Sequence, residues 1–258
     1  MRILVADDTP IALEYLSEAM QMLGHEVVEA TDGASALALA RKECFAALLL
    51  DLRMPGMFGD RALQQLRADP HAASRTSPAL AISSEMTPAL AEQLQRAGFA
   101  AAFRKPVDLA VLASAMHKLL ANAPHVNTPE ASTPASAVFN RNALLDDAAA
   151  LRVLGRKDVV DKLRSMFERE LEAFESSWEP WLAQRKAGLL REALHKLSAS
   201  AAICGAHALA ERIAQFQHAV RNEDWCAAQY VSDALRQVLA ATRSALLADQ
   251  ASAAAHGA

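Results

Sequence analysis

Short apolar runs alternate with segments of helical spacing throughout the first 121 residues. The strand-like runs cover residues 3–6, 27–28, 45–50, 80–82 and 100–103. Between them apolar residues recur every three or four positions, as at Leu13, Leu16 and Met20. Strands and helices that alternate at this pitch are typical of a parallel sheet with helices on both faces. We therefore expect residues 1–121 to form a doubly wound α/β domain.

The remaining residues follow a different pattern. Residues 122–138 contain three prolines among small polar residues and are predicted to be a flexible linker. Beyond it the apolar residues follow helical spacing only. Four stripes are present, over residues 160–181, 190–201, 209–220 and from 231 onward. They predict four amphipathic helices in an antiparallel all-α bundle over residues 139–247, and we expect residues 248–258 to be a disordered tail.

Composition excludes several classes of protein. The 26 basic and 30 acidic residues leave a net charge of -4, so no basic surface for nucleic acid is expected. Three cysteines without paired spacing argue against a disulfide framework and a zinc site, and favour a reducing cytoplasm. No apolar run is long enough to cross a bilayer, so we expect no direct membrane insertion.

Polar residues end four of the five strand-like runs. They are Asp7 and Asp8 after the first run, Asp51 after the third, Ser83 after the fourth and Lys105 after the fifth. The carboxyl ends of parallel strands meet at one edge of a sheet, where ligands bind. Three carboxylates at that edge suit Mg²⁺, and a lysine with a hydroxyl suits a phosphoryl group. Each residue alone could be a helix cap or a solvated loop end.

Taken in this order, the set resembles the receiver domain of two-component response regulators, and the loop from Asp51 to Gly56 matches as well. The resemblance implies a flavodoxin-like fold and phosphorylation of Asp51. It also implies that Asp7, Asp8, Asp51 and the Arg53 backbone carbonyl hold Mg²⁺. Ser83 and Lys105 would then bind the phosphoryl group. The family often has an aromatic residue three positions before the lysine. Ala102 stands there, and we expect the adjacent Phe103 to lie in the core.

His195 lies beside the second apolar stripe of the helical region, but not on it. Its neighbours one helical turn away, Arg191, Glu192, Ser198 and Ala199, are small or polar. The ring can therefore project with room around it, and a neutral imidazole is a nucleophile. A single helical histidine is nevertheless more often an ordinary surface residue.

The segment from His195 to Ala201 resembles the histidine phosphotransfer (HPt) domain, whose pattern is His-x-Leu-Lys-Gly-Ser-Ala. That resemblance implies that His195 carries a phosphoryl group. Ser198 replaces the usual lysine and Ala199 the usual glycine. Arg191, Lys196, Ser198 and Ala199 are the residues we expect at the surface around the histidine.

These features predict a phosphorelay protein that is not itself an enzyme, with a sensor histidine kinase and another response-regulator receiver as partners. The alternative is an interaction module whose helical domain binds a partner under control of Asp51 phosphorylation, without transfer to His195. An aspartyl-phosphate hydrolase is disfavoured because Arg53 stands where such enzymes commonly have a second acid. A DNA-binding regulator is disfavoured because the helical half lacks a basic recognition helix.

Overall fold

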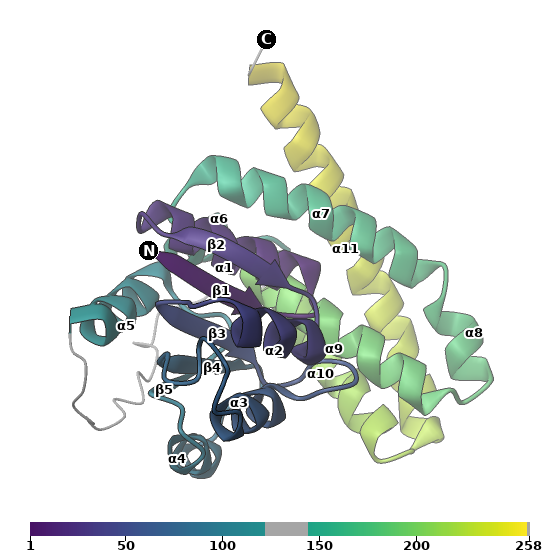
Figure 1. Cartoon of the computed structure of the whole chain (residues 1–258). Helices are drawn as coiled ribbons and strands as arrows, with labels where there is room; N and C mark the ends of the chain where they lie inside the picture. The colour runs from purple at the N-terminus through teal and green to yellow at the C-terminus, as the bar shows by residue number, and fades with distance from the viewer. Residues whose placement is uncertain (122–143, 257–258) are drawn as a thin grey trace. The chain divides into compact units, whose positions relative to one another are not determined.

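The computed structural model describes residues 1–121 and 144–256 (Figure 1). The chain divides into two compact units, Met1–Ala137 and Val138–Ala258. The linker expected at residues 122–138 lies outside the described residues. In the part of the chain described, no helix combines the length and the apolar character that crossing a membrane requires.

The first unit is built on a five-stranded parallel sheet. Its strands are β1 (Arg2–Ala6), β2 (Glu26–Ala30), β3 (Ala47–Asp51), β4 (Ala79–Ser83) and β5 (Ala101–Arg104). They lie in the order β2-β1-β3-β4-β5. Five helices connect or follow them: α1 (Pro10–Met22), α2 (Gly33–Lys42), α3 (Gly59–Ala68), α4 (Pro88–Arg96) and α5 (Leu109–Ala121). This is the flavodoxin-like doubly wound sheet that the alternating pattern predicts.

Both faces of the central strands are buried, as expected for a sheet covered by helices on each side. One face gathers alternate strand residues such as Leu4, Leu48 and Ala81, which pack with residues of α2, α3 and α4. Helix α1 packs on β1 and β2, and the Tyr15 hydroxyl donates a hydrogen bond to the Val107 carbonyl just before α5. Strand β5 is at the edge, so Phe103 is only partly buried and our expectation of a core position was wrong.

The second unit is entirely helical in its described part. It comprises α6 (Asp147–Leu154), α7 (Lys157–Glu175), α8 (Trp178–Ala183), α9 (Ala187–Ile203), α10 (His207–Arg221) and α11 (Trp225–His256). The four longer helices close a ring, with α9 on α10, α10 on α11, α11 on α7 and α7 on α9. Three-residue connections from α9 to α10 and from α10 to α11 make these neighbours antiparallel. The all-α bundle is therefore as predicted.

Aromatic residues fill one part of the bundle core. The Trp178 ring stacks on Phe174 with centroids 6.0 Å apart, and Phe216 meets it edge-on at 5.7 Å. The stripe over residues 160–181, which suggests one helix, is split because α7 ends at Glu175 and α8 begins at Trp178. Gly205 follows the end of α9 with φ of +77°, a left-handed conformation that glycine adopts without steric cost.

The disordered tail predicted for residues 248–258 was wrong as far as residue 256. These residues continue α11, which ends at His256. Alanine has the highest helix propensity, so an alanine-rich segment extends a helix that is already nucleated. Asp249 also anchors this end of α11, because its carboxylate pairs with the buried Arg164 of α7 at 2.9 Å.

Candidate functional site

The register of the sheet brings the predicted polar residues to one edge. Pairing of Ala6 with Leu50 and of Asp51 with Ile82 aligns the ends of β1, β3 and β4. Asp51 is the last residue of β3 and Ser83 the last of β4, whereas Asp7 and Lys105 directly follow β1 and β5. The carboxyl edge of the parallel sheet thus collects side chains that are up to 98 residues apart in the chain.

Three carboxylates converge at this edge. Asp7, Asp8 and Asp51 each offer an oxygen, and these three atoms lie within 4.8 Å of one another. The side chains of Asp7 and Asp51 are almost fully buried, and that of Asp8 is partly buried. Converging carboxylate oxygens of this kind are the ligands that a hard divalent cation prefers.

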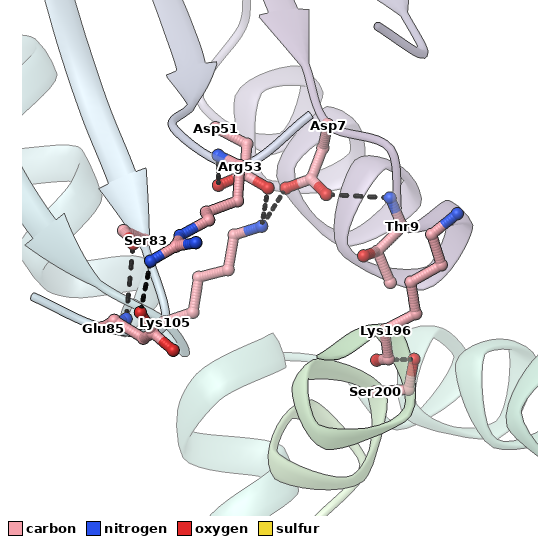
Figure 2. A network of polar contacts seen from close by, with 9 residues as sticks. All are labelled: Asp7, Thr9, Asp51, Arg53, Ser83, Glu85, Lys105, Lys196 and Ser200. Atoms are coloured by element: carbon pink, nitrogen blue, oxygen red, sulfur yellow. Dashed lines mark hydrogen bonds and ion pairs between the residues drawn. The ribbon is translucent and has the colours of Figure 1, made fainter. Parts of the chain in front are cut away.

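Lys105 joins two of these carboxylates. Its Nζ lies 2.5 Å from Asp7 Oδ2 and 2.9 Å from Asp51 Oδ2. Figure 2 shows the lysine pointing toward both carboxylates. The lysine side chain is only 5% exposed, so its charge is held close to both acids with little screening by water. One ammonium and three carboxylates leave two negative charges in the pocket when all four groups are ionised.

Burial changes the proton affinities in the pocket. Loss of hydration raises the pKa of Asp7 and that of Asp51 above the ordinary carboxylate value, although Lys105 opposes both shifts. Burial alone would lower the pKa of Lys105, but the Asp7 and Asp51 carboxylates outweigh it and raise that pKa. The lysine is therefore held firmly in its charged form.

The backbone around the pocket orients the carboxylates. The Thr9 N–H donates to Asp7 Oδ1 at 3.0 Å, and the Arg53 N–H donates to Asp51 Oδ1 at 3.3 Å. Gly59 begins α3 against the backbone of Asp51. A Cβ there would overlap the Asp51 carbonyl oxygen, so only glycine allows so close an approach.

An ion pair joins two loops beside the pocket, and the sequence pattern did not reveal it. Arg53 Nη2 lies 2.6 Å from Glu85 Oε2, which connects the loop after β3 to the loop after β4 (Figure 2). The Glu85 N–H also donates to Ser83 Oγ at 3.3 Å. No motif signals a pairing of residues 32 positions apart, because it depends on how the two loops meet.

His195 lies on α9 in the second unit, where it is partly buried. Next to it in the sequence, Lys196 pairs through its Nζ with Glu192 Oε1 at 3.3 Å. Ser200 Oγ donates a hydrogen bond to the Lys196 carbonyl at 3.2 Å, and Figure 2 shows this contact. Arg191 Nη2 pairs with Glu223 Oε1 at 3.1 Å. The Glu223 contact is a second feature that sequence reasoning missed.

Ser198 and Ala199, the two departures from the HPt pattern, differ in exposure. Ser198 is partly exposed, in line with a position at the surface around the histidine. Ala199 is 4% exposed, so our expectation of a surface position was wrong for this residue. Helices α7 and α10 pack against α9, and such packing can cover a side chain that is only a methyl group.

Comparison with known proteins settles the class of the first unit. The family model of the response regulator receiver domain matches residues 3–117. Protein PilH of Pseudomonas aeruginosa is 32% identical over 120 residues, which cover 46% of this chain and 98% of PilH. The chain belongs to the response regulator receiver family. Its carboxyl-edge cluster is therefore the acidic pocket of a receiver domain.

A longer relative aligns with more of the chain than the receiver. The sensory/regulatory protein RpfC of Xanthomonas campestris pv. campestris is 28% identical over 235 residues, or 87% of this chain. An alignment of that length extends beyond the 137 residues of the first unit. The chain spans only 31% of the length of RpfC.

Solved structures of receiver domains are also similar to part of the chain. One is the receiver domain of the sensor histidine kinase PA1611 from Pseudomonas aeruginosa, with a magnesium ion coordinated in its active site cleft. It is 25% identical, covers 47% of this chain and 98% of its own, and has a TM-score of 0.43.

Proposed function

We propose that this chain is a phosphorelay protein that accepts a phosphoryl group on Asp51 and carries one on His195. The proposal rests on the convergence of Asp7, Asp8 and Asp51 with Lys105 in a chain that belongs to the receiver family. Its parts would be a receiver at residues 1–121, a linker at 122–138 and an HPt domain at 139–247.

The residues of the receiver pocket fit Mg²⁺. Three converging carboxylates supply hard oxygen ligands, and the two negative charges left after Lys105 is counted match one divalent cation. Asp7, Asp8, Asp51 and the Arg53 backbone carbonyl would hold the ion. When bound, Mg²⁺ neutralises charge on the transferring phosphoryl oxygens.

Asp51 is the nucleophile in this proposal. One carboxylate oxygen forms a bond to phosphorus while the bond from phosphorus to the donor atom breaks, and the leaving group departs with its electron pair. Lys105 releases part of its contact with Asp51 and pairs with a phosphoryl oxygen. Ser83 donates its hydroxyl to a second oxygen. Buried charges that are already oriented stabilise the transition state with little reorganisation.

His195 serves as the second phosphoryl carrier. The four-helix ring and the position of the histidine on α9 support an HPt domain. An imidazole nitrogen bonds to phosphorus as the bond between phosphorus and an aspartyl oxygen breaks, and the carboxylate leaves with the electron pair. The same step runs in reverse when a receiver takes the group back.

This function implies two kinds of partner. A sensor histidine kinase would supply the phosphoryl group, and another response-regulator receiver would exchange it with His195. The chain itself would consume no nucleotide, and we propose it as a carrier with only slow loss of phosphate from Asp51. The alternative interaction module shares the first half of this scheme but leaves His195 unphosphorylated.

Phosphate labelling tests the proposal. The chain is incubated with Mg²⁺ and labelled acetyl phosphate, and acid and alkali stability distinguish acyl phosphate from phosphohistidine. Wild type should carry acyl phosphate, and Asp51→Asn should carry none. Asp60→Asn is the matched control, because Asp60 is an acidic residue of the same unit at the start of α3. Normal labelling of Asp51→Asn would refute the assignment.

The second carrier is tested with a donor that acts on histidine. Phosphoramidate should produce phosphohistidine in wild type and in His218→Gln, which changes an exposed histidine of α10, but none in His195→Gln. Adding a second, unlabelled chain whose Asp51 is intact then shows whether the phosphoryl group moves from His195 to a receiver. Phosphorylation of Asp51 with no label ever on His195 would favour the interaction module.

A further inference from the structure

A phosphoryl group on His195 needs positive charge near it. Such a group carries close to two negative charges at neutral pH and is stabilised by charged hydrogen-bond donors. On α9 the neighbours one turn after the histidine are Ser198 and Ala199, which carry no charge. The charge must therefore come from elsewhere around the histidine.

Arg191 has the geometry to supply it. It precedes His195 by four residues, so the two side chains share one face of α9. Side chains of a helix lean toward its N-terminus, which brings the imidazole over the turn that contains Arg191 rather than over Ser198. A guanidinium can also bind two phosphoryl oxygens at once.

The contact that holds Arg191 involves an unusual backbone. Its partner Glu223 has φ of +55°, in the left-handed region that glycine prefers after a helix end. Among the described residues, Glu223 and Arg185 are the two non-glycine residues with positive φ. A glutamate at this position costs conformational energy and places a carboxylate against Arg191 from the turn between α10 and α11.

Lys196 is the competing cation, but it faces another direction. It is adjacent to His195 in sequence and therefore about 100° away around the helix. Its ammonium pairs with Glu192, and Glu170 of α7 lies close enough to interact with its charge. Two carboxylates therefore compete for the charge of Lys196.

We propose that Arg191 is the phosphoryl-contacting residue of the second unit. It has the role that the lysine of the HPt pattern, which is replaced here by Ser198, would otherwise have. Glu223 holds the guanidinium in place while the histidine is unmodified. This inference rests on His195 being a phosphoryl carrier. When the group arrives, Arg191 exchanges one exposed carboxylate for an oxyanion of higher charge. Glu223, whose side chain is 66% exposed, is then hydrated by solvent.

Loading from phosphoramidate tests this inference in the full-length chain, in an Asp51→Asn background so that only histidine takes label. The initial rate of phosphohistidine formation is followed by ³¹P NMR. We expect Arg191→Gln to slow loading about tenfold, because it removes a charged hydrogen bond at a partly solvated position. Arg191→Lys should restore most of the rate. Glu223→Gln should raise it about threefold, because it removes a competing carboxylate.

Lys196→Gln is the matched control, since it removes a neighbouring cation from the same helix. Tryptophan fluorescence confirms that each variant is folded, because all three tryptophans are in the second unit. Unchanged loading of Arg191→Gln, or a larger loss with Lys196→Gln, would overturn the role of Arg191 while leaving His195 as a carrier. A folded wild-type chain that never loads His195 would remove the proposed function and this inference together.

Discussion

The two candidate phosphoryl sites differ in how much of each one is already built. Around Asp51 the side chains of Asp7 and Lys105 are buried, and the ends of three strands bring them into contact with it. Around His195 the nearby ion pairs lie on the surface, and the side chains of Arg191 and Glu223 are 45% and 66% exposed. The electrostatic interaction between two charges is stronger where water is excluded.

This difference in burial indicates which of the two units can stabilise the transition state of phosphoryl transfer. A pocket that holds nucleophile, cation and metal ligands together can stabilise a transition state by itself. A histidine on a helix face offers a nucleophile and one exposed cation, and it depends on a partner's pocket for the remainder. Under the proposed function, the receiver would be the catalytic half of any exchange and the helical unit would be the substrate.

The largest expected difference concerns stability, which should fall more when a buried cation is removed than when an exposed cation is removed. Lys105→Met leaves Asp7 and Asp51 buried without their counter-ion and should destabilise the first unit by about 3 kcal/mol. Mg²⁺ should recover part of this loss. Arg191→Met is the matched control and should cost the second unit less than about 1 kcal/mol. Hydrogen exchange measured separately in each unit checks both values, and equal losses would contradict the contrast.

A smaller contrast concerns two glycines at helix starts. Gly59→Ala forces a methyl group into the backbone of Asp51 and should cost about 2 kcal/mol, with slower labelling of Asp51. Gly188→Ala near the start of α9 meets no atom within 4 Å and should stabilise that helix by about 0.5 kcal/mol. Urea denaturation followed by hydrogen exchange measures both. If Gly59→Ala left both the stability and the labelling of Asp51 unchanged, the backbone around Asp51 would have to shift freely.

The smallest expected effect is a dependence of the second unit's stability on pH. Burial raises the pKa of Glu170 above 4.5, and Ser200 and Lys196 offset this only in part. The folded state therefore holds this proton more tightly than the unfolded state, so stability should fall as pH rises through 4.5 toward the raised value. Glu170→Gln should match wild type at pH 4 and exceed it at pH 7. Tryptophan fluorescence against urea measures the difference, and a variant that is less stable at pH 7 would reverse the sign.

Much of the fold followed from local pattern. Apolar runs that end in Asp7, Asp51 and Ser83 predicted which residues would meet, because parallel strands bring equivalent ends to one edge. The helical stripes likewise predicted the bundle. Local pattern failed at residues 248–256, where alanine content suggested a frayed end but an anchored helix forms.

Contacts between distant loops could not be predicted in the same way. Arg53 with Glu85, and Arg191 with Glu223, each join residues about thirty positions apart whose sequence contexts carry no shared signal. Surface charges have many possible partners, and the choice among them depends on turn geometry such as the positive φ of Glu223. Burial of Ala199 depends in the same way on how neighbouring helices pack.

The amino-acid pattern alone was enough to predict the succession of strands and helices along the chain, the polar residues at the strand ends and the face of α9 on which His195 lies. Periodicity and chain order suffice for these, because each follows from the geometry of a single element. Three contacts came to light only in the folded chain: Lys105 bridges Asp7 and Asp51, Gly59 lies against the Asp51 backbone, and Glu223 pairs with Arg191. Those features depend on distances between separate elements, which packing alone sets.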